Sequence, residues 1–126
     1  MRKIITFLSL ILICLSCVNF SAQAAEPELR DDTIYFFYYN ECPYCHKAMD
    51  YMNQKYPTLH IAMVNIHNPG GFDIILKCAK KFKLGRNIGT PLFCMGDNYV
   101  MGWSEESQKE FDEYVIPFLK AQKKEK

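Results

Sequence analysis

The feature that most constrains the fold is the run TIYFFYY at residues 33–39, which leads almost directly into a helix start. The run consists of β-branched and aromatic residues and shows no alternation between apolar and polar side chains. A strand with this pattern is covered on both of its faces. The sequence therefore predicts a sheet that has helices packed on both sides.

Three further strands and three helices follow from the spacing of apolar residues. The other predicted strands are residues 59–66, 90–95 and 99–103. The predicted helices run from Cys45 to Tyr56, from Phe72 to near Gly85, and from Ser104 to Phe118. Pro117 should kink or shorten the last helix. The result is an α/β fold of order β-α-β-α-β-β-α, with a mixed four-stranded sheet. Helical or strand spacing also assigns Met63, Phe72 and Leu76 to the core.

The first residues have the three-part pattern of a secretory signal peptide. A short basic start precedes an apolar run over residues 4–18, and an AQA cleavage site ends at Ala24. The run is shorter than the roughly 20 apolar residues that span a bilayer. We expect residues 1–24 to be removed and residues 25–126 to form a single small domain in the periplasm. A lipidated Cys17 is the weaker alternative.

The charge balance gives no argument for a nucleic-acid partner. The chain has 15 Lys and Arg against 14 Asp and Glu, a formal net charge of +1. This balance indicates neither nucleic acid nor an anionic membrane surface as a partner. The length is sufficient for one small core, and we predict a monomer.

Four of the six cysteines remain after the predicted cleavage: Cys42, Cys45, Cys78 and Cys94. An even number in an exported protein favours disulfides, and four cysteines allow three pairings. If the first two pair, Cys78 and Cys94 are left for a second bridge enclosing about 16 residues or as two buried thiols. A third possibility is that Cys94 exchanges with the first pair. A zinc site is not predicted, because no second close pair of ligands accompanies the first.

The motif Cys42-Pro43-Tyr44-Cys45 lies where the first strand ends and a helix begins, with Pro43 at the first helical position. Backbone N–H groups and the helix dipole favour a thiolate there, so the pKa of Cys42 should fall below that of a free thiol. This predicts Cys42 as the nucleophile of disulfide exchange and Cys45 as the resolving thiol. Tyr44 should be exposed and able to contact a substrate.

Extension of the motif to His46 also gives C-x-x-C-H, the attachment signature of a c-type haem. In that interpretation His46 binds the iron, with Met95 or Met101 as a second ligand. The β-α-β context favours the dithiol, because a haem would displace the helix from its sheet. His46 is then a first-turn residue beside the dithiol. A third interpretation is a non-catalytic binding domain with a structural disulfide.

CPYC after a strand, with GTP before a later strand, resembles the thioredoxin superfamily over about residues 33–118. CPYC is typical of glutaredoxins, and CPYCHK with GTP also resembles the exported Dsb-type disulfide isomerases. The resemblance implies a cis peptide bond between Thr90 and Pro91, in a loop that faces the dithiol. The backbone of this loop would pair with an extended substrate segment as a short β-augmentation. Pro43 and Tyr44 are the other residues expected to bind the substrate.

The predicted function is that of an exported protein disulfide oxidoreductase. Its substrates would be cysteine-containing exported proteins, and a separate redox partner would regenerate it. Whether it reduces, isomerises or forms disulfides stays open. No metal or organic cofactor is predicted. Glutaredoxins that bind glutathione have a basic residue shortly before the motif, and residues 38–41 contain none. They also have a Gly-Gly-x-Asp turn, which residues 102–105 do not match. Glutathione is therefore not expected as a cofactor.

Overall fold

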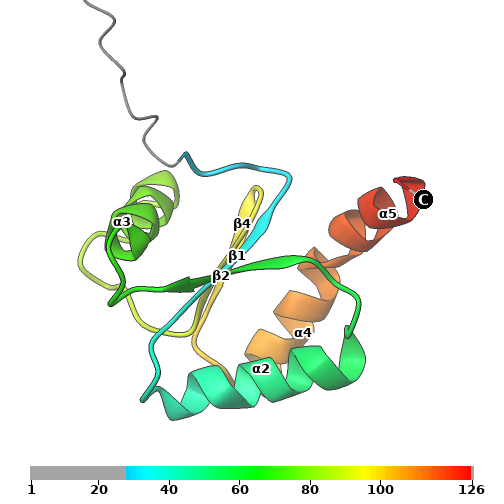
Figure 1. The fold of residues 1–126 in the computed structure, drawn as a ribbon, viewed down its shortest axis with the longest axis horizontal. Helices are drawn as coiled ribbons and strands as arrows, with labels where there is room; N and C mark the ends of the chain where they lie inside the picture. The colour runs from blue at the N-terminus through cyan, green and yellow to red at the C-terminus, as the bar shows by residue number, and fades with distance from the viewer. Residues whose placement is uncertain (1–27, 126) are drawn as a thin grey trace, which may run out of the picture.

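A four-stranded mixed sheet forms the centre of the computed structural model, which describes residues 28–125 (Figure 1). Strand β1 (Ile34–Tyr38) pairs in parallel with β2 (Ile61–Asn65) and in antiparallel with β3 (Leu92–Met95). Strand β4 (Asn98–Met101) is the antiparallel partner of β3. The strand order is β2-β1-β3-β4, so that β1 and β3 are the inner strands.

Helices cover both faces of this sheet, as predicted. Helices α2 (Pro43–Lys55) and α4 (Glu105–Tyr114) lie on one face and α3 (Gly71–Lys81) lies on the other (Figure 1). Helix α5 (Ile116–Lys124) follows α4. The α/β fold and the predicted order of strands and helices are confirmed up to the last helix. The predicted signal peptide and Cys17 lie outside the described residues. No helix within the described range is long and apolar enough to cross a membrane.

The aromatic strand β1 contributes to two cores. Ile34 and Phe36 lie in the core beneath α2 and α4, whereas Tyr35 and Phe37 lie in the core beneath α3. All four side chains are buried. Successive side chains of a strand point to opposite faces, and here neither face meets water. This explains the absence of polar alternation in the sequence of the strand.

The predicted last helix is in fact two helices. Helix α4 ends at Tyr114 and α5 begins at Ile116. Pro117 has no N–H group to continue the helical ladder, so one continuous helix is interrupted just before it. Pro117 instead lies in the first turn of α5, where a missing N–H has no cost. Ser104, at the predicted start of this helix, is the N-cap of α4, since its Oγ accepts a hydrogen bond from the N–H of Ser107 at 3.1 Å.

The assignment of Met63, Phe72 and Leu76 to the core was wrong. Their side chains are 47%, 56% and 43% exposed. Met63 belongs to β2, which is an edge strand. Helix α3 begins against the end of β2, where a Cβ on Gly71 would overlap the carbonyl oxygen of Asn65. Because Gly71 is the residue that lies against β2, Phe72 and Leu76 lie on the exposed side of α3. The buried residues of α3 are Gly71, Ile75, Cys78 and Ala79.

A disulfide between Cys78 and Cys94 links α3 to β3 in the structure. The two Cα atoms are 6.4 Å apart, within the range that a disulfide spans. Both cysteines are buried in the core beneath α3. Of the interpretations left open by the sequence, the structure therefore has the bridge.

Helices α2 and α4 are joined by polar contacts to Asp112. Its carboxylate accepts hydrogen bonds from the hydroxyls of Tyr51 (2.7 Å) and Tyr56 (2.6 Å), and Lys55 Nζ lies 2.7 Å from it. Burial acts to raise the pKa of Asp112, but the hydrogen bonds from Lys55 and the two tyrosines outweigh it and lower that pKa. Burial and the same carboxylate raise the pKa of Tyr56 to about 12.

Replacement of both Cys78 and Cys94 by alanine should lower the free energy of unfolding by about 3 kcal/mol. The bridge joins residues 16 positions apart and restricts the unfolded chain accordingly. Urea unfolding without reductant measures the effect while the other disulfide stays closed. A double variant as stable as the wild type would show that the bridge contributes nothing to stability.

Asp112→Asn should lower the free energy of unfolding by about 1–2 kcal/mol at neutral pH, because three donors lose a charged acceptor that is partly exposed. Since the folded pKa of Asp112 is lowered, its contribution is present above the ordinary carboxyl pKa of about 3.9. It is lost as the pH falls through the folded value. The variant should therefore show a shallower loss of stability in acid than the wild type.

Urea unfolding at a series of pH values measures this difference. Asp50→Asn serves as the control, since Asp50 is an exposed carboxylate on the same helix α2. Parallel acid limbs for the wild type and Asp112→Asn would contradict the role given to Asp112.

Candidate functional site

Cys42 is the N-cap of α2, a few residues after β1 ends. Its backbone is extended (φ −81°, ψ 105°), and its Sγ accepts a hydrogen bond from the N–H of Cys45 at 3.2 Å. Pro43 occupies the first turn, where no N–H is needed. An N-cap sulfur faces the unpaired N–H groups at the positive end of the helix dipole. The position therefore favours negative charge on the sulfur of reduced Cys42.

In the structure the sulfur atoms of Cys42 and Cys45 are joined in a disulfide. The two Cα atoms are 5.2 Å apart. The cysteines are 2% and 0% exposed and belong to the core beneath α2. Tyr44, which lies between them, is 54% exposed. The disulfide is thus shielded by protein, whereas the residue beside it is open to an approaching partner.

The loop before β3 brings Thr90 to the dithiol from 48 residues away in sequence. Its Oγ1 hydroxyl donates to Cys42 Sγ over 3.6 Å. The Thr90–Pro91 peptide bond is cis, and Pro91 is buried. Because β3 is antiparallel to β1, its first residues lie at the end of the sheet where β1 gives way to α2. The structure thus brings Thr90 against the dithiol, with Pro91 next to it in the chain.

Sequence analysis missed a set of contacts around the turn between β1 and α2. The carbonyl oxygen of Asn40 accepts from His46 Nε2 at 2.6 Å, and its Oδ1 accepts from Asn65 Nδ2 at 3.2 Å. The ring of Tyr39 stacks on that of His67, with centroids 5.4 Å apart. The one sign of these contacts in the sequence is that polar residues stand between a buried strand and a helix. Their spacing does not indicate which partners they meet.

The residues around the dithiol do not fit a c-type haem. The two motif sulfurs are bonded to each other within the core. His46 Nε2, a nitrogen that would bind iron, is held by the carbonyl of Asn40. Met95 is buried in the core, and Met101 Sδ accepts from the N–H of Gly89 at 3.3 Å. Across residues 28–125, no group of three or more His, Cys, Asp or Glu is arranged to hold a metal ion.

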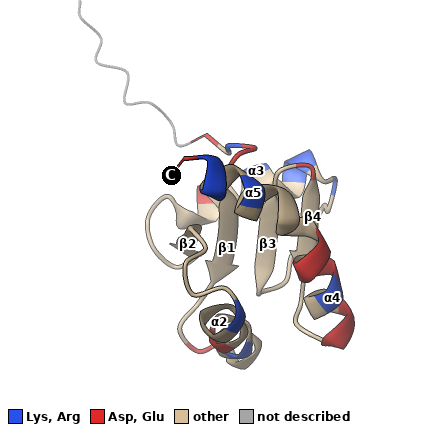
Figure 2. Cartoon of the chain, turned by 90° about the vertical axis from the view of Figure 1, so that its right-hand side faces the viewer, with Lys and Arg blue, Asp and Glu red and all other residues tan. Residues whose placement is uncertain are grey.

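A shallow groove of about 430 Å³ begins at Tyr44 and runs between α2 and the start of α4. Lys47, Trp103 and Glu105 are among its lining residues. Lys47 Nζ lies 5.2 Å from the centre of the Tyr44 ring, at a distance that permits a cation–π contact. Asp and Glu residues, coloured red, are prominent along α4 (Figure 2). The surface beside the dithiol therefore presents an aromatic ring and charges of both signs.

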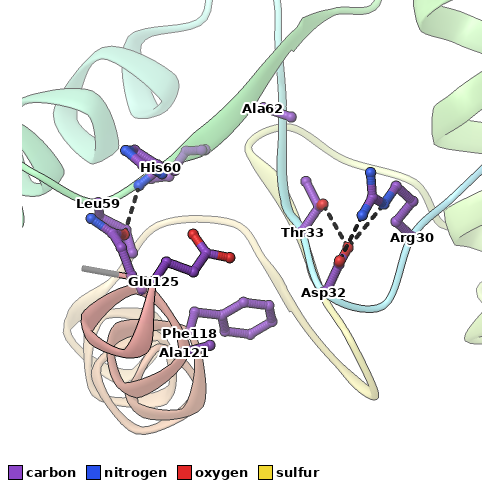
Figure 3. Close-up of a pocket in the computed structure, with 11 residues that line it drawn as sticks. Arg30, Asp32, Thr33, Leu59, His60, Ala62, Phe118, Ala121 and Glu125 are labelled. Carbon is purple, nitrogen blue, oxygen red and sulfur yellow. Dashed lines mark hydrogen bonds and ion pairs between the residues drawn. The ribbon is translucent and has the colours of Figure 1, made fainter.

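A pocket of about 590 Å³ lies at the opposite end of β1 (Figure 3). Arg30, Asp32 and Thr33 line it from the segment before β1, and Phe118 lines it from α5. Arg30 and Asp32 form an ion pair of 2.7 Å within it. The parallel strands β1 and β2 start here and end on the dithiol side. The pocket is therefore separated from Cys42 by the length of β1 and does not belong to the dithiol site.

Comparisons with known proteins add little to this geometry. The sequence matches no family model and no curated protein. Among solved structures, the chain is similar to a buckwheat glutaredoxin in complex with glutathione. The two share 18% sequence identity and a TM-score of 0.48, over 70% of this chain and 76% of the other. At that level the likeness by itself supports no conclusion about activity or about glutathione.

Thr90→Val should slow the alkylation of reduced Cys42 at neutral pH by about 2- to 5-fold, because the thiolate loses one hydrogen-bond donor. The substitution keeps the shape and β-branching of the side chain. Iodoacetamide labelling in the Cys78→Ala/Cys94→Ala background, followed by mass spectrometry, measures the rate. Thr58→Val, in the exposed turn between α2 and β2, is the control. An unchanged rate in Thr90→Val would show that this hydroxyl does not support the thiolate.

Proposed function

We propose that the protein is an exported thiol–disulfide oxidoreductase that exchanges disulfides with cysteine-containing exported proteins. The observation that supports this most strongly is the position of Cys42 at the N-cap of α2. Its sulfur lies within hydrogen-bonding distance of the Cys45 N–H and the Thr90 hydroxyl. These donors stabilise a thiolate, which is the attacking species in disulfide exchange.

In the reducing direction, the thiolate of Cys42 attacks one sulfur of a substrate disulfide. The substrate S–S bond breaks, a mixed disulfide with Cys42 forms, and the other substrate sulfur leaves as a thiolate. Deprotonated Cys45 then attacks the sulfur of Cys42, which closes the Cys42–Cys45 disulfide and releases the second substrate thiolate. Two electrons pass to the substrate, and its two sulfurs take up two protons. The oxidising direction is the reverse of these steps.

Substrate contact is proposed for the four residues that border the dithiol: Pro43, Tyr44, Thr90 and Pro91. Tyr44 is more than half exposed and offers an apolar ring beside the reacting sulfur. The loop at Thr90 touches Cys42 and offers backbone groups that an extended substrate segment could pair with. The exposed ring of Tyr44 and the open groove that begins at it suit contact with a polypeptide.

Export is proposed from the amino-terminal sequence pattern and agrees with the cysteine chemistry. Two disulfides in so small a domain are typical of oxidising compartments such as the periplasm. The exchange passes electrons between sulfurs alone and requires no metal or organic cofactor. A separate redox partner must restore the working state of the dithiol, and we propose that the protein acts as a monomer.

Cys45→Ala should accumulate a mixed disulfide between Cys42 and a disulfide-bonded substrate such as insulin, because the resolving thiol is absent. Cys42→Ala should reduce the catalysed rate of insulin reduction by dithiothreitol to the uncatalysed rate. The Cys78→Ala/Cys94→Ala variant serves as the control and should keep its activity. Non-reducing electrophoresis and insulin turbidity measure the two effects. A wild-type protein that does not accelerate insulin reduction would instead favour a binding domain with a structural disulfide.

A further inference from the structure

Asn40 lies in the turn between β1 and α2, two residues before Cys42, and is held from two sides. From α2, His46 Nε2 donates to its backbone carbonyl oxygen at 2.6 Å. From the end of β2, Asn65 Nδ2 donates to its side-chain oxygen at 3.2 Å. A carbonyl oxygen only accepts hydrogen bonds, so the proton of the first contact is on His46 Nε2. The helix and the sheet thus both anchor one residue of this turn.

This turn sets the position of Cys42. The N–H of Cys42 donates to the carbonyl oxygen of Tyr39 at 3.2 Å, which closes a four-residue turn that contains Asn40. On the other side, the N–H of His46 donates to the carbonyl oxygen of Cys42 at 3.2 Å. The backbone of Cys42 is therefore fixed between the turn and the first helical bond. His46 contributes to both, through its main chain and through its ring.

The two redox states depend on this turn to different extents. In the oxidised protein, the covalent bond to Cys45 itself holds Cys42 against the first turn of α2. In the reduced protein that bond is gone, and the turn has to keep the sulfur beside the Cys45 N–H and the Thr90 hydroxyl. Only the reduced form has a Cys42 thiolate for these two donors to stabilise, so a contact that keeps Cys42 beside them stabilises the reduced form more than the oxidised form.

We propose that His46 is a positioning residue that raises the reduction potential of the Cys42–Cys45 couple through its bond to the Asn40 carbonyl. Stabilisation of the reduced form makes a dithiol couple more oxidising. The inference rests on the proposed function, because it assigns His46 a role in tuning that same dithiol. It gives the histidine of the C-x-x-C-H sequence a use that involves no haem.

The test compares the dithiol–disulfide equilibrium of the wild type with that of His46→Ala in glutathione buffers at neutral pH. Rapid alkylation and mass spectrometry of the peptide that contains Cys42 and Cys45 give the equilibrium constant. We expect His46→Ala to shift this constant about 3- to 10-fold toward the disulfide, as for the loss of one hydrogen bond. Alanine is a better helix former than histidine, so weakening of α2 does not explain such a shift.

Two further variants separate positioning from other effects. His46→Gln keeps an N–H donor of similar reach and should restore at least half of the shift on a logarithmic scale. His60→Ala removes an exposed imidazole at the far end of β2 and should leave the constant unchanged. His46→Leu replaces His46→Ala if the alanine variant does not fold. The proposal would be overturned if His46→Ala, or His46→Leu in its place, had the same constant as the wild type. It would also be overturned if His46→Gln shifted the constant as far as the variant without a donor.

The measurement also separates this inference from the proposed function. It is made at equilibrium on the dithiol itself and needs no catalytic turnover of a protein substrate. A wild type that is inactive toward insulin, together with a shifted constant in His46→Ala, would overturn the proposed function and leave the role of His46. A purely structural role would lower the stability of both redox forms equally and leave the constant unchanged, which would overturn the inference alone.

Discussion

The burial of β1 on both faces is the constraint on which the site depends. Ile34 and Phe36 on one side and Tyr35 and Phe37 on the other fix the strand within the sheet, between two cores. The chain leaves this fixed strand through a short turn and enters α2 with Cys42 as its N-cap. A rigid strand therefore sets where the helix begins and which end of its dipole meets the sulfur.

The two disulfides within residues 28–125 lie in different surroundings. Cys78 and Cys94 lie in the core beneath α3, linking a helix to an inner strand. Cys42 and Cys45 lie at a helix start, beside an exposed tyrosine and a threonine hydroxyl. The donors that favour a thiolate therefore lie beside Cys42 and Cys45. This contrast is the physical basis for regarding one bridge as structural and the other as reactive.

The sequence sufficed for features that depend on local pattern. The uninterrupted apolar strand, Pro43 at the start of α2 and Ser104 as the cap of α4 all follow from neighbouring residues. Contacts between segments far apart in the sequence could not be predicted, because a sequence pattern does not give distances in space. The hydrogen bonds from α2 to Asp112 span up to 61 positions, and the bond from His46 to Asn40 depends on the path of a turn.

The reduction potential of the Cys42–Cys45 couple tests the central claim most directly. It can be measured by equilibration with redox buffers, followed by alkylation and mass spectrometry of the peptide that holds both cysteines. The account predicts a value within the range of catalytic dithiols, roughly −270 to −120 mV. The Cys78–Cys94 bridge, measured in the same samples, should be harder to reduce. A Cys42–Cys45 potential below about −300 mV, as in structural disulfides, would contradict the account.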